Sequence, residues 1–397
     1  MSVLKTLSVQ SLRNLASVNI ALSPSINIFY GDNGSGKTSI LEAVALLGLG
    51  RSFRSHKSRS LIHHDKSDLT VFASLQLEDD ATSLEIKSES LLSPQQEPCF
   101  PVGIQKFRNG SSLIKSSGEV VRSAALLAKQ LPLLIINANS FQLIEGSPVQ
   151  RRQFLDWIVF HVKPEFATLW RGLQKILKQR NSLLRRDKIS REDLAPWDSE
   201  FIRLSEAIDQ VRREVFDIFI RDFERFDTIF SLSSHNISME YYSGWDKDQS
   251  IGESLEANFD RDCRDGYTHH GPQRAEIKIK AQSKPAIDVL SRGQEKALVC
   301  AMTITKAHVY QQLVSKKCVF LIDDLLAELD QHHSKILVDW LLSLNVQVLI
   351  TGVMQKELLK PWLEKGVSPA VFHVKHGEVV LQPQESGNEE TVNSLKN

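Results

Sequence analysis

The stretch Asn27–Leu41, NIFYGDNGSGKTSIL, decides the fold of this chain. Within it Gly31, Gly36, Lys37 and Thr38 complete the spacing G-x-x-x-x-G-K-[ST], and the apolar residues before it predict the strand that such a loop follows. At average composition this spacing would arise by chance in roughly 1 % of chains of this size. The stretch therefore predicts a phosphate-binding loop between a strand and a helix, and with it an α/β fold.

Each residue type in this loop suits a polyphosphate. Glycine at positions 31, 34 and 36 gives the backbone angles that let successive N–H groups face one anion. Lys37 would reach the β- and γ-phosphates, the Thr38 hydroxyl would bind Mg²⁺, and the helix beginning near Lys37 would direct its positive end at the phosphates. A glycine-rich turn without ligand is the alternative, but such a turn needs no Lys-Thr pair. We expect ATP to bind at Gly31, Asp32, Asn33, Gly34, Ser35, Gly36, Lys37, Thr38 and Ser39.

Bulk composition excludes several classes of protein. Lys+Arg and Asp+Glu both number 48 in 397 residues, so any contact with nucleic acid must come from local patches rather than from a global field. The four cysteines are scattered without a C-x-x-C pair, which disfavours a zinc site or a disulfide framework and indicates a reducing compartment. Neither a signal peptide nor an apolar run of membrane-spanning length is evident, so we expect a cytoplasmic protein that does not enter a membrane.

A second group of motifs lies far along the chain. Leu290-Ser291-Arg292-Gly293-Gln294 opens a long apolar-periodic helix, and CVFLIDD (318–324) follows as an apolar strand that ends in two carboxylates. After it come Ala327-Glu328-Leu329-Asp330 and a further strand, Val346–Ile350. L-S-x-G-Q alone is a weak motif, since an ordinary helix cap would also explain Ser291. The four pieces in this order are far more specific than any one of them.

That order resembles the ABC-type ATPases, and the resemblance implies roles for these residues. Ser291, Arg292, Gly293 and Gln294 would form a signature that caps the γ-phosphate held by a second copy, so that ATP holds a homodimer together. Asp323 would hold Mg²⁺, Asp324 and Lys37 would be catalytic, and Asp330 would bridge to the opposite subunit. Transporter-like members have Glu at the position of Asp324 and a His where Thr351-Gly352 stands here, so we expect slow hydrolysis that acts as a timed switch.

Hydrophobic patterning predicts the domain organisation. Alternation from Asp68 onward and the Asn109-Gly110 turn predict an antiparallel accessory sheet, and apolar residues at helical spacing predict a helical arm interrupted at Pro196-Trp197. We therefore expect an ABC-type P-loop head with this accessory sheet, formed by 1–135 and 288–382. A mostly helical second lobe would comprise 136–287, and the polar tail 383–397 would be disordered.

Two basic stretches are candidate phosphate contacts. Residues 51–59, RSFRSHKSR, are either a solvated loop or a contact to the nucleotide or to nucleic acid, through Arg51, Arg54 and Lys57. Residues 171–191 carry eight Lys/Arg against one acid, and are either the charged side of an amphipathic helix or a surface that follows a phosphate backbone, through Lys178, Arg185 and Arg186. The adjacent His269 and His270 are poorly placed to bind one metal ion.

Seven motifs extend over nearly the whole chain: SLRNL (11–15), GDNGSGKTS (31–39), GRSFRS (50–55), GSPVQRRQFLDW (146–157), THHGPQRAE (268–276), LSRGQ (290–294) and LIDDLLAELD (321–330). On these motifs the chain resembles the RecF family of bacterial recombination-repair ATPases, in the SMC-like branch of the ABC-type ATPases. The resemblance implies an ATP-dependent clamp that binds gapped and single/double-strand junction DNA. With RecR and RecO it would promote RecA loading, and it would support replication restart and the SOS response. One departure is Ala138-Asn139, where relatives have Pro and an acid, which leaves the role of nearby Gln142 open.

Two other classes of protein share the phosphate-binding loop. The ATP-binding subunit of a transporter is the first, but the long stretch between Thr38 and Leu290 predicts an arm rather than a compact membrane-docking insert. A small-molecule kinase is the second, and it has no use for a signature helix. A Ser291→Arg variant without effect would favour the kinase.

Overall fold

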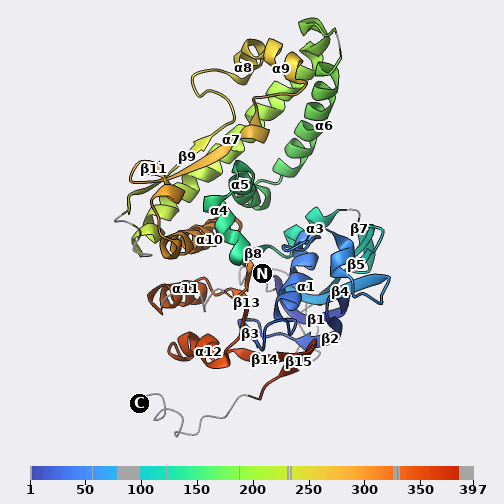
Figure 1. The fold of residues 1–397 in the computed structure, drawn as a ribbon, viewed down its shortest axis with the longest axis vertical. Helices are drawn as coiled ribbons and strands as arrows, with labels where there is room; N and C mark the ends of the chain where they lie inside the picture. The colour runs from blue at the N-terminus through green and yellow to red at the C-terminus, as the bar shows by residue number, and fades with distance from the viewer. Residues whose placement is uncertain are drawn as a thin grey trace, which may run out of the picture. The chain divides into compact units, whose positions relative to one another are not determined.

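The computed structural model describes residues 2–55, 57–77, 99–121, 123–186, 188–229, 232, 235–324, 329 and 331–383 (Figure 1). It divides into two compact units, one formed by Met1–Ala138 with Lys316–Asn397 and the other by Asn139–Ser315. The first boundary lies three residues beyond the expected one. The second lies at 315/316 rather than 287/288, because helix α10 (Arg292–Val314) packs on α5 (Pro148–Val162) and α7 (Arg191–Ile229) of the second unit. By its packing, the signature helix therefore groups with the helical arm.

A six-stranded sheet forms the centre of the first unit. Its order is β15-β14-β3-β13-β12-β8, and all neighbours are parallel except β15, which pairs antiparallel with β14. The inner strands β12 and β13 are buried along their whole length, as near-continuous apolar runs in a parallel sheet must be. The strands are β3 (Ile26–Tyr30), β8 (Leu133–Ile136), β12 (Val319–Ile322), β13 (Gln347–Gly352), β14 (Ala370–Lys375) and β15 (Glu378–Leu381).

Helices cover both faces of this sheet (Figure 1). Helix α1 (Lys37–Leu49) lies on one face, and α11 (Gln331–Ser343) and α12 (Gln355–Leu363) lie on the other. The short helices α2 (Ser58–Leu61) and α3 (Ala124–Gln130) complete the unit. Because all the parallel strands run the same way, their carboxyl ends meet at one edge, beside the start of α1.

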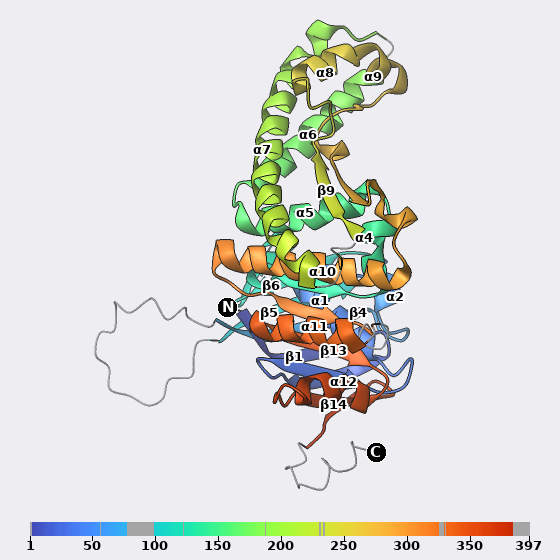
Figure 2. The same cartoon turned by 90° about the vertical axis from the view of Figure 1, so that its left-hand side faces the viewer.

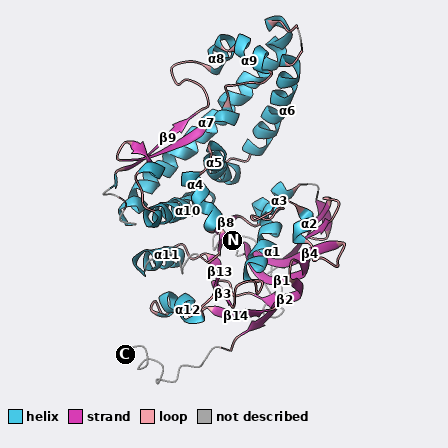
Figure 3. Cartoon of the chain, viewed as in Figure 1, coloured by secondary structure: helices cyan, strands magenta, loops and turns pink. Residues whose placement is uncertain are grey.

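The predicted antiparallel accessory sheet is present, in the order β2-β1-β4-β5-β6-β7. Figure 3 shows its strands β1, β2 and β4 in magenta. The Asn109-Gly110 turn joins β5 to β6, and Gly110 has φ +91° there. Helix α1 is buried between the two sheets, in one core that also includes Val71 of β4 and Leu321 of β12. The strands are β1 (Ser2–Leu12), β2 (Leu15–Ala21), β4 (Asp68–Leu77), β5 (Cys99–Phe107), β6 (Ser112–Ser116) and β7 (Glu119–Val121).

The second unit is mostly helical, as predicted, and is built on the paired helices α6 (Phe166–Leu184) and α7 (Arg191–Ile229), which Figure 2 shows side by side. The expected interruption at Pro196-Trp197 was wrong, because Pro196 lies inside α7 near its start, where a missing N–H removes a single helical hydrogen bond. The remaining elements are α4 (Gln142–Glu145), α5 (Pro148–Val162), β9 (Ile237–Tyr242), α8 (Ile251–Ala257), α9 (Phe259–Asp265), β10 (Glu276–Ala281) and β11 (Lys284–Pro285). Within the described ranges, no helix is long and apolar enough to span a bilayer.

Candidate nucleotide-binding site

The loop between β3 and α1 has the backbone that its glycines predict. Gly31, Gly34 and Gly36 have φ values of +152°, +80° and +120°, which other residues rarely adopt. The surroundings also forbid side chains: a Cβ on Gly31 would lie 2.1 Å from the carbonyl oxygen of Val374, and one on Gly36 would lie 2.9 Å from Leu15 Cδ2. The loop can therefore curve tightly against β14 and the β1–β2 turn only with glycine at these positions.

The start of α1 is suited to an anion. Lys37 is buried, and its Nζ donates to the carbonyl oxygens of Gly31 at 2.8 Å and Asp32 at 3.0 Å, so the ammonium lies inside the loop. Helix α1, which is described in full, has no acidic residue in its first turn. Its N-cap residue is Gly36, which has no side chain to accept hydrogen bonds from the first N–H groups. The first N–H groups of the helix thus remain available beside a buried cation. This arrangement fits the phosphates of a nucleotide.

Residues outside the loop fix its shape. The side-chain Nδ2 of Asn14 donates to the carbonyl oxygen of Gly34 at 3.1 Å, and Asn14 Oδ1 accepts from the Ser39 hydroxyl at 3.2 Å. On the other side, the N–H of Gly377 donates to the carbonyl oxygen of Ser35 at 2.9 Å. Sequence reasoning did not identify Asn14 as part of the site, although it lies in the SLRNL stretch. Only the fold brings the β1–β2 turn beside the loop.

Two threonines and a carboxylate meet at the edge of the sheet. Asp323 Oδ1 accepts from the Thr38 hydroxyl at 2.9 Å and from the Thr351 hydroxyl at 2.7 Å. The structure thus brings together Thr38 and Asp323, the two residues expected to bind Mg²⁺. Burial raises the pKa of Asp323, and the hydrogen bonds from the two hydroxyls oppose that rise. A half-buried carboxylate beside a hydroxyl, both oxygen ligands, fits a divalent cation, whose charge would favour the ionised form.

Asp324 is held in a strained position next to this pair. Its φ is +55°, and its N–H donates to the Thr351 hydroxyl at 3.1 Å. One of its carboxylate oxygens, Oδ1, is buried and has no hydrogen-bond partner among the described residues. An acceptor of this kind at the edge of a phosphate site suits the expected role of polarising a water molecule. Thr351, which the sequence marked only as a missing histidine, contacts both aspartates.

The GRSFRS stretch is attached to α1 through Glu42. This fully buried carboxylate binds the guanidinium of Arg13 and the hydroxyl of Ser52, and Ser52 Oγ accepts from the N–H of Arg54 at 2.9 Å. The Arg54 guanidinium lies 4.0 Å from Glu42 and electrostatically lowers the pKa of Asp323. Of the alternatives for this stretch, the geometry favours contact between Arg54 and the nucleotide. Arg51, Arg54 and Lys57 are all exposed.

The signature motif forms the open start of α10. The Ser291 hydroxyl accepts from the N–H of Gln294 and the Gln294 side chain accepts from the N–H of Ser291, so Ser291 is a helix cap as the simpler interpretation predicted. Its own hydroxyl proton remains available to a phosphate. Ser291, Arg292 and Gly293 are exposed, and a Cβ on Gly293 would meet no described atom within 4 Å. The positive end of a long helix is therefore uncovered there.

Other expected residues occupy separate places. Asp330 and residues 384–397 of the expected tail lie outside the described residues, so the structure describes neither. Gln142 is exposed at the start of α4, just after the 3-10 turn Ala138–Phe141 that contains Ala138-Asn139. Lys178, Arg185 and Arg186 are exposed on or just after α6.

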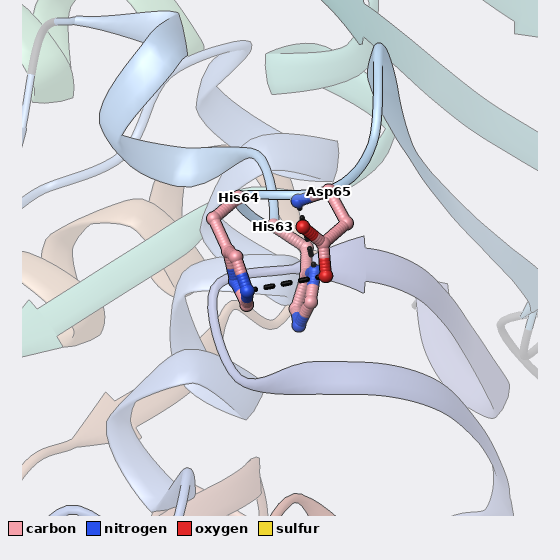
Figure 4. A group of neighbouring side chains, drawn as sticks. All are labelled: His63, His64 and Asp65. Carbon is pink, nitrogen blue, oxygen red and sulfur yellow. Dashed lines mark hydrogen bonds and ion pairs between the residues drawn. The ribbon is translucent and has the colours of Figure 1, made fainter.

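Neither group of histidines is a convincing metal site. The His269 ring contacts Asp262 at 2.8 Å and the His270 ring contacts Ser254 at 2.5 Å, so the two rings turn to different partners. His63, His64 and Asp65 form a compact group on the loop before β4 (Figure 4), but His64 and Asp65 are exposed and pair with each other at 3.1 Å. We assign a metal ion to neither group.

Comparison with known proteins gives a consistent result along nearly the whole chain. Residues 3–370 match the family described as RecF/RecN/SMC N terminal domain. The protein named DNA replication and repair protein RecF from Cellvibrio japonicus is 45% identical over 377 residues, which cover 95% of this chain and 98% of that protein. A protein of the same name from Saccharophagus degradans is 42% identical over 381 residues, covering 95% and 99%.

Solved structures share the fold. A structure titled as the recombination mediator protein RecF with ATP in the RecFOR pathway matches with a TM-score of 0.81 at 21% identity, covering 96% of this chain and 98% of that one. The Smc head domain from Pyrococcus furiosus, which has an extended coiled coil, matches with a TM-score of 0.56 at 15% identity, covering 100% of both chains. At these identities the structural match supports the ATPase fold itself, and the sequence relatives carry the assignment to a family.

Proposed function

The chain belongs to the RecF family, and on that premise we propose that it is an ATP-dependent DNA-binding clamp of recombinational repair, which dimerises on binding ATP and opens after hydrolysis. The observation that carries this proposal is a pair of incomplete half-sites. One is the phosphate loop with Thr38 and Asp323, and the other is the uncovered start of α10 at Ser291 and Gly293. Two copies would complete each other's sites, giving an isologous interface that contains two nucleotides.

Residues of the loop would act in sequence as a nucleotide binds. The Lys37 ammonium would exchange the carbonyl oxygens of Gly31 and Asp32 for phosphate oxygens, which carry more negative charge. Thr38 and Asp323 would hold Mg²⁺, which would neutralise charge on the β- and γ-phosphates while the γ-phosphoryl group passes to water and ADP leaves. Asp324 would then accept a hydrogen bond from the attacking water through its unpartnered oxygen. A short carboxylate without a neighbouring histidine favours slow turnover, as suits a timed switch.

Partners follow from the family assignment. The structure titled for RecF with ATP calls that protein a recombination mediator in the RecFOR pathway, and the sequence relatives are named for DNA replication and repair. We infer that this chain binds gapped or junction DNA in the cytoplasm, and acts with RecR and RecO to promote RecA loading, replication restart and the SOS response. Nothing in the comparisons favours the transporter subunit.

An experiment on DNA retention tests this proposal. Binding of a fluorescein-labelled gapped duplex would be followed by anisotropy without nucleotide, with ADP and with ATP, for the wild type, Lys37→Ala and Asp324→Asn. We expect ATP to tighten binding, Lys37→Ala to abolish the tightening, and Asp324→Asn to prolong it because the clamp cannot open. Equal affinity with ADP and ATP would refute the switch.

A further inference from the structure

Charge is segregated between the two long helices of the second unit. Helix α6, whose residues are all described, carries Arg171, Lys175, Lys178 and Arg180 and no acidic residue. The helix packed beside it, α7, carries 11 Asp/Glu against 6 Arg in its printed sequence. Although the protein has zero net charge, helix α6 is strongly cationic. The acidic residues of α7 limit the positive electrostatic potential of α6 to the side that faces away from α7.

The cations of α6 form a stripe along one side. Arg171, Lys175, Lys178 and Arg185 are exposed and follow each other at intervals of four, three and seven residues, which places them within one face of a helix. At a rise of 1.5 Å per residue the stripe spans about 21 Å, or roughly 60 % of a turn of B-DNA. Arg180 lies on the opposite side, where it is fully buried against Asp262. We call the four exposed residues the α6 stripe.

The α6 stripe is not neutralised within the described part of the chain. None of its members has a carboxylate within ion-pair distance among those residues. Arg171 instead donates to the carbonyl oxygen of Ala167 in its own helix, and Arg185 Nε donates to that of Gly266 at 3.2 Å. Four of the six arginines of α7, by contrast, form ion pairs with acids among the described residues, as Arg203 does with Glu200 and Arg213 with Asp209. Unpaired cations at this density favour an external polyanion.

A shallow cavity of about 270 Å³ lies along the stripe, and its lining suits a sugar-phosphate backbone. Lys178 and Arg185 border it with Gln174, Leu177 and Asn181. The Asn181 oxygen accepts from the N–H and hydroxyl of Thr268, so its amide Nδ2 is left to donate to a phosphate. The aromatic residues of α6 are not available for base stacking, since Phe166 is buried and Trp170 packs under the guanidinium of Arg212. The exposed Tyr267, next to Gly266, already contacts the His269 ring and the Arg274 guanidinium. Because α6 itself has no stacking platform, the stripe is suited to duplex rather than single-stranded nucleic acid.

We propose that the α6 stripe, with the Lys178–Arg185 cavity at its centre, binds the phosphate backbone of duplex DNA without reading its sequence. The inference rests on the proposed function, and it names the surface and the kind of DNA. In gapped or junction DNA, the stripe would hold the double-stranded part.

The test is a salt titration with matched charge changes. Binding of a labelled 30-base-pair duplex would be measured with ATP between 50 and 200 mM salt for the wild type and for Lys178→Gln/Arg185→Gln. Gln keeps the Cγ and Cδ atoms that pack beside Gly266 at position 185. The control is Lys278→Gln/Lys284→Gln, which removes two exposed charges of β10 and β11 in the same unit. Loss of two phosphate contacts should reduce the salt slope by about 1.8 for each copy that contacts the duplex. With one copy in contact, the affinity gap between wild type and variant then narrows about twelvefold over this range.

The possible results of the salt titration either support or overturn duplex binding by the α6 stripe. A reduced slope and weaker duplex binding in the stripe variant, with the control like the wild type, would support the inference. An unchanged slope, an equal loss in the control, a loss confined to a 30-nucleotide single strand, or competition by polyglutamate as strong as by duplex would overturn it. Molar mass with ATP separates this failure from that of the proposed function, because the stripe variant should still dimerise. A wild type that binds no DNA with ATP would instead refute the proposed function.

Discussion

Replacing Thr351 with valine should destabilise the first unit and perturb both aspartates of the site. The hydroxyl of this fully buried residue donates to Asp323 Oδ1 at 2.7 Å and accepts from the N–H of Asp324 at 3.1 Å. Valine has the same shape, so the substitution removes these two hydrogen bonds and little else. The hydroxyl thus bridges the carboxylate expected to hold Mg²⁺ and the backbone N–H of Asp324, the residue expected to polarise water.

The two lost contacts set the expected magnitude. A hydrogen bond to a charged group contributes about 1.5–3 kcal/mol, and an N–H left without an acceptor in a buried site costs about 1–3 kcal/mol. Asp323 and Asp324 are half-buried, so we take the lower part of each range and expect a loss of about 3 kcal/mol in the free energy of unfolding. For a unit of this size that corresponds to a fall in melting temperature of roughly 6–12 °C.

Thermal unfolding of the nucleotide-free protein by circular dichroism, with urea unfolding for the free energy, measures this effect. Thr351→Ser keeps the hydroxyl and should stay close to the wild type. Thr303→Val is the matched control, because that buried hydroxyl donates only to Val299 of its own helix, at 2.7 Å, and we expect a loss below about 1 kcal/mol. If Thr351→Val proved as mild as Thr303→Val, the bridging role argued for Thr351 would be wrong.

Three further predictions concern other parts of the structure. Asn14→Ala removes the hydrogen bond to Gly34 and should weaken ATP binding about three- to tenfold in calorimetry, since one such bond contributes about 0.5–1.5 kcal/mol. An unchanged affinity would show that the loop keeps its shape without Asn14. Arg180→Leu removes the guanidinium that pairs with the buried Asp262, and should lower the free energy of unfolding of the arm by about 3–5 kcal/mol, measured with urea. Adding Asp262→Asn should restore part of that stability. If it restored none, the unpaired charge would be excluded as the cause. Burial raises the pKa of Asp323 above its usual 3.8, so Mg²⁺-dependent ATP binding should decline on acidification at a higher pH than it would with an exposed carboxylate. Asp323→Asn should remove this pH dependence. A decline that persists in Asp323→Asn would assign the pH dependence to another group.

The parts of the fold that sequence predicted well are those fixed by local chemistry. The glycines of residues 31–36 adopt backbone angles that their residue type favours. A short apolar run such as 318–322, followed at once by two carboxylates, is typical of an inner strand. The expected meeting of Thr38 with Asp323 follows from two parallel strands ending at one edge. The antiparallel accessory sheet was likewise predictable, because alternation and an Asn-Gly turn are short-range signals.

The features that sequence could not predict depend on long-range contacts. Asn14 and Thr351 have ordinary identities, and only the pairing of β1 with β2 and of β13 with β3 places them against the loop and the two aspartates. Because α10 packs on α5 and α7, the signature helix belongs to the second unit and not to the predicted head. Pro196 was misjudged because a proline near the start of a long helix removes too little to end it.

The central claim is that ATP joins two copies through the phosphate loop of one and the signature helix of the other. Molar mass in solution by light scattering, without nucleotide, with ADP and with ATP, for the wild type and Ser291→Arg, tests it most directly. We predict a monomer that dimerises with ATP alone, and a Ser291→Arg variant that binds ATP yet stays monomeric. A mass that does not respond to nucleotide, or a Ser291→Arg variant that dimerises like the wild type, would contradict the account.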